Sequence, residues 1–485
     1  MLKESSLDKI LYRVKKLIPG SVFNFFQPYY HAVLAYAGAA FYGFPSRKLK
    51  VIGVTGTKGK STVVYLASKL LEARLQGGQK PGFGKSGVAA CGSLGFKIKS
   101  KEWPNTLKMT MPGRFRLQKL MAEAVRAGCE YFILEVTSEG IKQKRHLGIW
   151  FDCAVFTNLH KEHIESHGSF ENYYQAKQEL FRRTKNIHVI NADDQYTKLL
   201  GDFPAEHKIF YGFTKGDLVA GNLKLSDLGS SFEVYGTTYN IHLAGKFNIL
   251  NCLAVLSIGA MYGIDLPSAK HILESVKFIP GRMEFIPAFV KTSAGEQKEP
   301  FKVVVDYAHT PESLRSVYET LKNSPLSRKA SEDAQNTKRK LICILGAAGG
   351  GRDKWKRPEF GRIAAQYCDE IILTNEDPYE ENPEAILEEI ASGFSQAPNH
   401  KSSRFYRGSS IAKQSGQITN KSQAPNVQKI MDRKEAIKKA LTLAQEGDTV
   451  IITGKGSETS MAVSGNRKIP WSDKGVIEEF LTTKY

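Results

Sequence analysis

Residues Leu49 to Ala73 read LKVIGVTGTKGKSTVVYLASKLLEA, and this stretch decides the first half of the fold. Its apolar beginning predicts a buried strand and its end predicts a helix, with a glycine turn between them. Gly56 and Gly59 let backbone N–H groups approach an anion closely, and a helix that begins near Lys60 directs its positive dipole end to the same place. A tight structural turn is the alternative, but the flanking strand and helix favour a phosphate-binding loop.

The loop departs from the standard phosphate-binding pattern, in which the first glycine stands about five residues before the second. Val54 occupies that position here, so the local form is the shorter Gly56-x-x-Gly59-Lys60-Ser61. Lys60 supplies a mobile positive charge, and Ser61 or Thr62 supplies a hydroxyl for Mg²⁺. The predicted nucleotide-binding residues of the loop are Gly56, Thr57, Lys58, Gly59, Lys60, Ser61 and Thr62.

Composition limits the class of protein. The chain has 485 residues, enough for about two or three domains with substantial cores. Its formal net charge of +19 is dispersed, without a long basic block or an aromatic-interleaved RNA-binding signature, and anionic small substrates account for it as well as nucleic acid does. The cysteines are scattered without a C-x-x-C pair, which predicts reduced thiols in a cytosol and neither a disulfide frame nor a cysteine metal site.

Residues 1–49 predict a short, helical N-terminal segment. Within it, residues 17–45 are uncharged apart from His31, rich in Tyr and Phe, and interrupted by Pro28. The run is too short to span a bilayer comfortably, so it is either a helix packed on the next domain or an anchor at the membrane surface. We find no cleavable secretory signal and expect a cytoplasmic protein, at the inner membrane surface if the anchor forms. The basic residues that flank the run are Lys15, Lys16, Arg47 and Lys48.

The remaining chain divides into two α/β units, a central domain at 50–280 and a C-terminal domain at 281–485. In the first, strand patterns such as 131–136 and 151–159 alternate with helical patterns such as 170–183 and 246–263. The second unit predicts a doubly wound sheet, because helical patterns separate its strand patterns. Those strand patterns are 301–308, 340–346, 370–374 and 449–454, and polar insertions are predicted at 323–338 and 396–429.

Polar residues follow the ends of several of these predicted strands. Open α/β sheets bind ligands outside the carboxyl ends of their strands, so these residues are candidates for a site. They are Glu135, Asn158, Asp306, Tyr307, His309, Glu376, Asp377, Gly454, Lys455 and Glu458.

Three histidines, His160, His163 and His167, suggest zinc by their spacing. The metalloprotease pattern H-E-x-x-H is absent, and no cysteine stands nearby. Downstream of a phosphate loop, Mg²⁺ that bridges nucleotide phosphates is the better use for Glu135 and His163. Lys177 lies in a helical pattern, where a lysine alone is usually a solvated charge.

Taken together, the motifs resemble the Mur ligase family, and within it the MurE-type enzymes. The resemblance runs in order from about Lys50 to Val463, through VTGTKGKST, TMPGRFRLQ, EVTSEGIKQKR, FTNLHKEHIESHGSFENYYQAK, GKFNILNCLA, PGRME, VDYAHTPESL, GGGRDKWKRP, DRKEAI and GKGSE. It implies a central P-loop ATPase-like domain with a mainly parallel sheet, followed by a smaller Rossmann-like domain. The interval 177 − 163 = 14 matches the family's spacing from a metal-binding histidine to a carbamylated lysine.

The resemblance also implies roles for individual residues. Lys60, Glu135, His163 and Lys177 would be catalytic, and the Mg²⁺ ligands would be Ser61, Glu135, His163 and Lys177 as a carbamate. ATP would contact the loop and Asn248, Arg282, Asp306 and Tyr307. The muramoyl-peptide would contact Thr110, Met111, Pro112, Thr137, Gln143 and Arg145. The other substrate-binding candidates are Arg357, in a loop with Asp353 and Lys354, and Glu376, Asp377, Gly454 and Glu458.

The implied reaction is ATP-dependent amide ligation in peptidoglycan synthesis. A carboxylate of UDP-N-acetylmuramoyl-L-alanyl-D-glutamate attacks the γ-phosphorus of ATP, and a free amino acid then attacks the acyl phosphate. Mg²⁺ and Lys60 would neutralise charge, and closure of the last domain would exclude water. We expect a monomer with no nucleic-acid partner.

Three departures from the family pattern stand out. The N-terminal segment is shorter than the family's uridine-nucleotide domain, so we expect these residues to do something other than bind uridine in the usual way. Ser457 replaces a histidine in GKGSE. The motif that reads D-N-P-R in diaminopimelate-adding members reads Glu376-Asp377-Pro378-Tyr379, which favours lysine or ornithine over meso-diaminopimelate.

Other functions were weighed against this one. A folylpolyglutamate or cyanophycin-type ligase would share the loop and the lysine, but TMPGRF and DYAHTPESL favour the MurE type. A non-catalytic nucleotide-binding paralogue is opposed by the joint presence of Lys60, Glu135, His163 and Lys177. A nucleic-acid ATPase lacks a helicase-like second motif.

Overall fold

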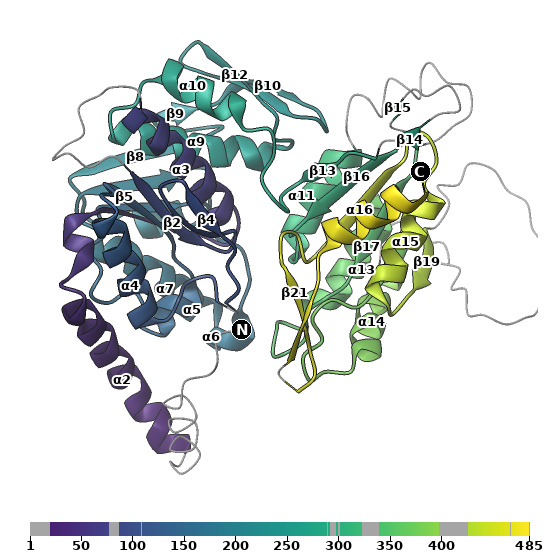
Figure 1. The fold of residues 1–485 in the computed structure, drawn as a ribbon, viewed down its shortest axis with the longest axis horizontal. Helices are drawn as coiled ribbons and strands as arrows, with labels where there is room; N and C mark the ends of the chain where they lie inside the picture. The colour runs from purple at the N-terminus through teal and green to yellow at the C-terminus, as the bar shows by residue number, and fades with distance from the viewer. Residues whose placement is uncertain are drawn as a thin grey trace, which may run out of the picture.

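The computed structural model describes residues 20–76, 87–107, 109–288, 290–291, 297–298, 301–322, 339–396, 425–465 and 467–484. The predicted insertion at 323–338 lies outside the described residues, as do positions 397–424 of the second one. The described chain forms two α/β lobes, one built around each of two large sheets (Figure 1).

The first lobe is built on a nine-stranded sheet of order β4-β3-β2-β5-β1-β6-β7-β8-β9. Its strands pair in parallel from β2 to β9, while β3 and β4 add an antiparallel edge. The central strands are buried apolar runs, as strands covered on both faces must be. The bounds are β1 (Lys50–Thr55), β2 (Val88–Gly92), β3 (Gly95–Ile98), β4 (Lys101–Trp103), β5 (Tyr131–Glu135), β6 (Cys153–Phe156), β7 (Ile187–Asn191), β8 (His207–Gly212) and β9 (Leu218–Val219).

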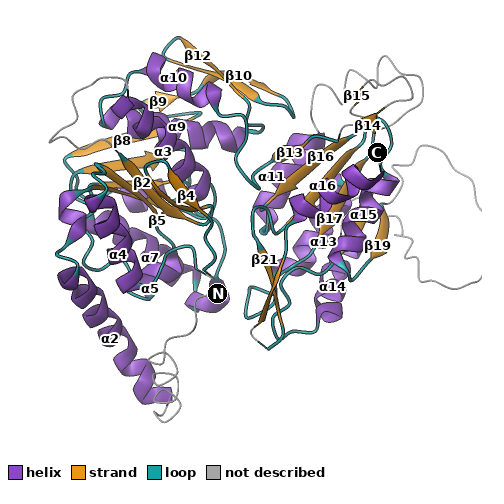
Figure 2. Ribbon diagram, in the orientation of Figure 1, coloured by secondary structure: helices purple, strands orange, loops and turns teal. Residues whose placement is uncertain are grey.

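Helices cover both faces of this sheet (Figure 2). Along β1, Val51 faces the helices α4 (Arg114–Arg126) and α7 (Phe170–Arg183), while Ile52 faces α3 (Lys60–Gln76) and α9 (Lys246–Met261). Short helices α5 (Ser138–Lys142), α6 (Ile164–His167) and α8 (Thr197–Gly201) fill the connections. A small antiparallel sheet of β10 (Gly221–Leu225), β11 (Ser230–Val234) and β12 (Thr237–Ile241), beside α10 (Leu266–Ser275), completes the lobe.

The second lobe has a six-stranded sheet of order β13-β16-β20-β17-β18-β19, parallel except for β13. Its strands are β13 (Glu284–Ile286), β16 (Lys302–Asp306), β17 (Leu341–Leu345), β18 (Glu370–Leu373), β19 (Asn426–Lys429) and β20 (Thr449–Thr453). One face carries α11 (Pro311–Lys322), α13 (Lys356–Tyr367), α14 (Pro383–Ala391) and η3 (Ser392–Gln396), and the other carries α15 (Arg433–Leu443) and α16 (Asp473–Lys484). Two small pairs, β14 (Val290–Lys291) with β15 (Gln297–Lys298) and β21 (Ser460–Val463) with β22 (Arg467–Pro470), lie apart from it. The predicted fold class is confirmed.

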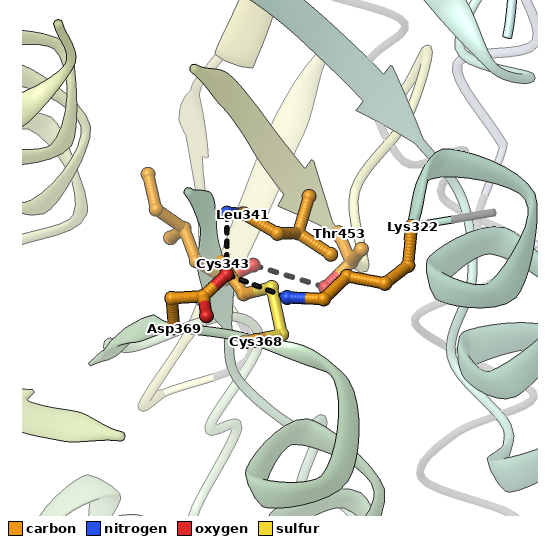
Figure 3. Close-up of a disulfide and its surroundings, with 7 residues drawn as sticks. Lys322, Leu341, Cys343, Cys368, Asp369 and Thr453 are labelled. Carbon is orange, nitrogen blue, oxygen red and sulfur yellow. Dashed lines mark hydrogen bonds and ion pairs between the residues drawn. A yellow bond between two sulfur atoms is a disulfide. The ribbon is translucent and has the colours of Figure 1, made fainter. Parts of the chain in front are cut away.

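One cysteine expectation is wrong. Cys343 on β17 is joined by a disulfide to Cys368, the residue that ends α13 just before β18 (Figure 3). Sequence spacing did not indicate this pair because 25 residues separate the two, and only the crossover through α13 brings them to adjacent strands. Asp369, the residue after Cys368, also links these elements: it accepts hydrogen bonds from Leu341 N at 2.9 Å and from Lys322 Nζ at 2.6 Å. The other cysteines, Cys91, Cys129, Cys153 and Cys252, are free and buried.

The N-terminal segment contains α2 (Gly20–Phe41) and the 3-10 turn η1 (Pro45–Lys48). We expected Pro28 to interrupt this segment, but α2 runs through it as one helix. The missing N–H of a proline costs one backbone hydrogen bond, which a long helix can lose without ending. Among the described residues, no helix is long and apolar enough to cross a membrane. In Figure 1, α2 extends away from the first lobe beyond its packing contact with α4.

Candidate active site

The loop between β1 and α3 has a backbone that only glycine fits at two positions. Gly56 and Gly59 have φ angles of 147° and 84°, in the region that L-residues rarely adopt. A Cβ atom on Gly56 would strike the Thr157 hydroxyl, and one on Gly59 would strike the side-chain oxygen of Asn251. Asn251 Nδ2 in turn donates to Asn248 Oδ1 at 3.2 Å, so the predicted ATP contact Asn248 lies directly behind the loop.

The chain that follows β6 fixes the loop. Asn158 accepts a hydrogen bond from Thr57 N at 2.8 Å through its carbonyl and one from Lys58 N at 2.9 Å through its side chain. Lys60 Nζ folds back on the loop and donates to the carbonyl oxygens of Gly56 at 3.0 Å and Thr57 at 2.9 Å. The loop is therefore preformed, with the charge of Lys60 held over it.

A carboxylate and two hydroxyls meet beside the loop. Glu135, at the end of β5, accepts hydrogen bonds through Oε2 from Ser61 Oγ at 3.1 Å and from Ser93 N at 2.9 Å and Oγ at 3.0 Å. The Ser61 and Ser93 hydroxyls are 2.6 Å apart. Oxygen ligands of this kind are those that Mg²⁺ prefers, so the residues present fit that ion. Sequence reasoning missed Ser93, which carries no motif of its own.

Lys177 of α7 points into the same place. Its Nζ donates to Gly56 O at 2.8 Å and lies 4.5 Å from the ring centroid of Tyr173, and the residue is 3% exposed. Burial lowers the pKa of Lys177 well below its ordinary value, and the charge of Lys60 acts in the same direction. The solvated helix lysine that the sequence alone suggested is therefore a buried amine whose neutral form is favoured.

The histidines singled out in the sequence have different surroundings. His163 begins α6 with a positive φ of 57°, and burial lowers its pKa to about 4, which keeps the imidazole neutral as a metal ligand requires. His167 lies 3.6 Å from Glu139 instead. Within the described ranges, no three His, Cys, Asp or Glu side chains gather closely enough to hold a metal by themselves. A cation held here would therefore also need Ser61 and Lys177.

A buried carboxylate that sequence reasoning missed joins the two lobes. Glu162 is 3% exposed and lies 3.5 Å from Lys58 Nζ and 3.3 Å from Nε2 of His309, which follows β16 in the second lobe. Burial alone would raise the pKa of Glu162, but Lys58 holds it well below its usual range. Burial lowers the pKa of His309 to about 3 and that of Lys58 to about 8. The phosphate loop thus touches the second lobe directly.

A second contact between the lobes is reciprocal. Glu165 N donates to Asp353 Oδ1 at 3.0 Å, and Lys354 N donates to Glu165 Oε1 at 2.8 Å. Nearby, Lys161 Nζ lies 4.9 Å from the ring centroid of Trp355. The loop that precedes α13 is therefore docked on α6, and the two lobes contact each other at this point.

The residues expected to contact ATP from the second lobe lie near the lobe junction. Asp306, at the end of β16, accepts hydrogen bonds from Met283 N and Ala308 N, each at 2.7 Å, and burial raises its pKa. Its carboxylate therefore fixes the two chain segments around it. The Arg282 guanidinium lies 4.4 Å from the ring centroid of Tyr307, so these two side chains form one surface.

The predicted muramoyl-peptide residues lie around α5, with Thr137 at its start and Gln143 and Arg145 at and just after its end. Arg145 donates to the Met111 carbonyl and, at 2.6 Å, to Gln143 Oε1. Thr137 caps α5 by accepting from Gly140 N at 3.0 Å. Thr110 and Pro112 flank Met111 in the chain. The structure thus brings together residues that the sequence separates by more than thirty positions.

The predicted amino-acid pocket differs from expectation. Asp377 and Glu458 do converge, but on the chain's own Lys455, whose Nζ lies 2.9 Å from Asp377 Oδ1 and 2.5 Å from Glu458 Oε2. Glu376 is buried, and burial raises its pKa to about 7. A Cβ on Gly454 would strike the Glu376 carboxyl group. The expectation of three available carboxylates is corrected, because Lys455 already neutralises part of their charge.

Arg357 does not lie open to a substrate. It is 1% exposed and donates to Glu389 at 2.7 Å, to Glu381 at 3.0 Å and to the Ala348 carbonyl at 3.3 Å. Carboxylates of its own lobe occupy the guanidinium in this conformation, and its substrate-binding role stays a prediction. Arg352 lies instead within interaction range of Tyr379.

Comparison with known proteins identifies the family of this chain. The Mur ligase middle domain matches residues 54–259, and the Mur ligase glutamate ligase domain matches residues 281–456. The UDP-N-acetylmuramoyl-L-alanyl-D-glutamate--2,6-diaminopimelate ligase 1 of Clostridium acetobutylicum is 33% identical over 453 residues, covering 92% of this chain and 81% of that protein. This chain belongs to the Mur ligase family. The UDP-N-acetylmuramyl-tripeptide synthetase of Roseiflexus sp. is also 33% identical to this Mur ligase, with the same coverage of both chains.

Solved structures agree with this membership. A UDP-N-acetylmuramoyl-L-alanyl-D-glutamate--2,6-diaminopimelate ligase superposes with a TM-score of 0.56 at 26% identity, covering 93% of this Mur ligase and 83% of that chain. The Mycobacterium tuberculosis folylpolyglutamate synthase shares the fold, with a TM-score of 0.61 at 16% identity over 87% of this chain and 92% of its own. The resemblance inferred from the motifs is confirmed, and with it the class of enzyme, an ATP-dependent ligase.

Proposed function

We propose that this Mur ligase joins an amino acid to UDP-N-acetylmuramoyl-L-alanyl-D-glutamate in peptidoglycan synthesis, through an acyl phosphate formed with ATP. The observation that carries the proposal is the meeting of Lys60, Ser61, Glu135 and Lys177 around one glycine loop that also touches the second lobe. The printed names of the relatives at 33% identity support this choice of substrate.

Each residue has a task that its position allows. The Gly56–Thr62 loop receives the phosphates, and Lys60 moves from the loop carbonyls to their negative charge. Ser61, Glu135, His163 and Lys177 would hold Mg²⁺, which would supply Lewis-acid polarisation of the phosphoryl oxygens. Arg145, Gln143 and Thr137 hold the muramoyl-peptide. Closure through Glu165 and Asp353 keeps water from the activated carbonyl until the amine arrives.

Lys177 acts as a carbamate in this proposal. Only a neutral amine adds to CO₂, and the lowered pKa of this buried side chain favours that form. The nitrogen bonds to the CO₂ carbon and loses one proton to water, which leaves an anionic carbamate. This anion would be attracted to a bound Mg²⁺, whereas an ammonium would be repelled. Burial therefore disfavours the ammonium form of Lys177 and favours the neutral amine from which the carbamate forms.

The added amino acid ends in an amine, as in lysine or ornithine. Glu376, Asp377 and Glu458 outnumber Lys455 in this pocket, and the nearby Arg433 guanidinium is paired with Asp473. Burial raises the pKa of Glu376, while Arg433 lowers it and Asp377 raises it. Tyr379 offers no cation to a second carboxylate at the position where diaminopimelate-adding relatives carry arginine. Arg352 is the residue that would overturn this choice, since it lies near Tyr379.

We infer a cytoplasmic monomer, because ATP and nucleotide-linked precursors are cytoplasmic, with no nucleic-acid partner. Contact of residues 17–45 with the membrane surface is a separate inference that does not depend on the ligase reaction.

The experiment is phosphate release from ATP, measured with the full-length protein across UDP-muramoyl-dipeptide, folate and a panel of amino acids. Release that requires UDP-muramoyl-dipeptide and an amino acid together supports the proposal, and Lys60→Ala should abolish it while the fold persists. Release that requires folate, or wild-type turnover by folded Lys60→Ala, contradicts it. Equal lysine and meso-diaminopimelate, followed by product mass, decides the amino acid.

A further inference from the structure

Helix α2 has two opposite faces. One is made of small residues: Ala35, Gly38 and Ala39 are buried. A Cβ on Gly38 would lie 3.4 Å from Phe115 of α4, so the absence of a side chain there lets the two helices approach closely. The spacing of three and four residues puts all three on one side of the helix.

The other face carries large apolar side chains in the solvent. Val33 is 66% exposed and Phe41 75%, with Tyr30 at 48% and Tyr36 at 47%. At about 100° per residue Tyr30, Val33 and Phe41 lie on the side away from Ala35 and Ala39, and Tyr36 lies at the edge of that side nearer Ala39; we call the four the apolar stripe. Because α2 is apolar on both faces, one of them stays exposed to water, and an exposed apolar face of this kind indicates a binding surface.

The charged residues next to the stripe in the sequence are all basic, although Lys119 on the adjacent helix α4 also lies 4.0 Å from Glu123. Between Asp8 and Glu72 the sequence contains no aspartate or glutamate. Arg47 and Lys48 follow the helix in η1, and the Arg47 guanidinium lies 4.1 Å from the ring centroid of Trp150, which is itself 46% exposed. On α4, Arg116 and Lys119 are exposed one and four residues beyond Phe115, which is close to Phe41.

We propose that the apolar stripe lies in the headgroup layer of an anionic bilayer. Amphipathic helices bind in this way with their apolar face down, and Tyr and Trp are enriched at that depth. The face of small residues holds the rest of the protein on the water side. Basic residues at the rim then meet anionic lipid headgroups, each adding to the attraction.

Charge also argues against a second copy of the chain as the partner of this face. Two copies paired through the stripe would bring two predominantly basic surroundings together, on chains that each carry a net charge of +19. An anionic lipid surface is the partner that complements both the apolar area and the charge.

The test is flotation of the full-length protein with vesicles at low salt. The wild type should float with phosphatidylcholine mixed with phosphatidylglycerol and stay in the dense fraction with phosphatidylcholine alone. Val33→Gln with Tyr36→Gln should lose flotation, because it makes the stripe polar while keeping good helix formers. Val219→Gln with Leu228→Gln is the matched control, since both residues are exposed and apolar but lie on β9 and in the loop before β11.

Three outcomes contradict the proposal. If the wild-type protein floats with neither vesicle, something other than lipid covers the stripe. Sedimentation then distinguishes a dimer paired through the stripe from a monomer in which its own chain covers it. Equal flotation of the stripe variant and the control places the lipid contact elsewhere. Flotation with both vesicle types would show that anionic lipid is not required for binding. Circular dichroism and ATP-dependent phosphate release in solution show that each variant is folded, and neither depends on the vesicles.

Discussion

Lys177 Nζ donates a hydrogen bond of 2.8 Å to the carbonyl oxygen of Gly56, which lies 121 residues earlier in the chain. An amine that is 3% exposed thus lies on the floor of the phosphate loop, and the loop's own backbone is its partner. A carbonyl oxygen accepts a bond from a neutral amine or from an ammonium, so this contact does not require the charge that burial opposes.

The first prediction concerns this amine. Lys177→Ala should abolish ligation, and added formate or acetate should restore part of the activity, because a short carboxylate replaces the anion that the carbamate supplies. The direct measurement is carbon-13 NMR in labelled bicarbonate, where the wild type should give a carbamate signal that Lys177→Ala lacks. Lys185→Ala removes an exposed lysine and should keep both the signal and the activity. An active wild type without the signal would contradict the carbamate.

The second prediction concerns the backbone of the loop. Gly59→Ala places a methyl group against Asn251 at a φ of 84°, which costs about 1–3 kcal/mol of stability and should weaken ATP binding. Gly221→Ala is the control, because a Cβ there has nothing within 4 Å. Denaturant unfolding and calorimetric titration with an ATP analogue measure the two effects. Equal affinity of both variants for the analogue would show that the loop does not hold the phosphates.

The third prediction is a pH dependence that belongs to Glu376. Its pKa is about 7 in the folded protein against an ordinary value of 4.5, so the folded state holds the proton more tightly than the unfolded chain. That contribution to stability is fully present below about pH 4.5 and is lost as the pH rises through about 7, a change of about 3 kcal/mol. Urea unfolding at pH 5 and pH 8 should show the loss of stability in the wild type and a smaller loss in Glu376→Gln. An identical change in stability between the two pH values in the wild type and in Glu376→Gln would contradict the assignment to Glu376.

The fourth prediction concerns closure of the lobes. Glu165→Ala removes the acceptor of Lys354 N, a net loss of about 1 kcal/mol for such a hydrogen bond, and should shift the nucleotide-free protein toward open forms. Small-angle scattering should report a larger radius of gyration than in wild type, and a nucleotide analogue with substrate should reverse the difference. Glu206→Ala, an exposed glutamate of the first lobe, should leave the radius unchanged. No change in Glu165→Ala would mean that other contacts hold the lobes.

Much of this architecture was predictable because it follows from local pattern. The strand before the glycine loop is a short apolar run, and the helix Phe170–Arg183 has a helical pattern with a capping serine before it. Both elements can therefore be predicted from neighbouring residues alone. What sequence reasoning missed depends on tertiary contact. Nothing local indicates that Lys455 points between Asp377 and Glu458, or that Arg357 is taken by its own lobe. The disulfide was missed for the same reason, since only the crossover through α13 places its two cysteines together.

That disulfide encloses the docking loop. The 25-residue separation from Cys343 to Cys368 contains Asp353 and Lys354, so the segment that clasps Glu165 belongs to a covalently closed ring anchored on the sheet of the second lobe. A ring closed at its base cannot peel away from the sheet one strand at a time. When Glu165 separates from Asp353 in the oxidised enzyme, the force on the clasp therefore reaches the β17–β18 pair through a chemical bond as well as through hydrogen bonds.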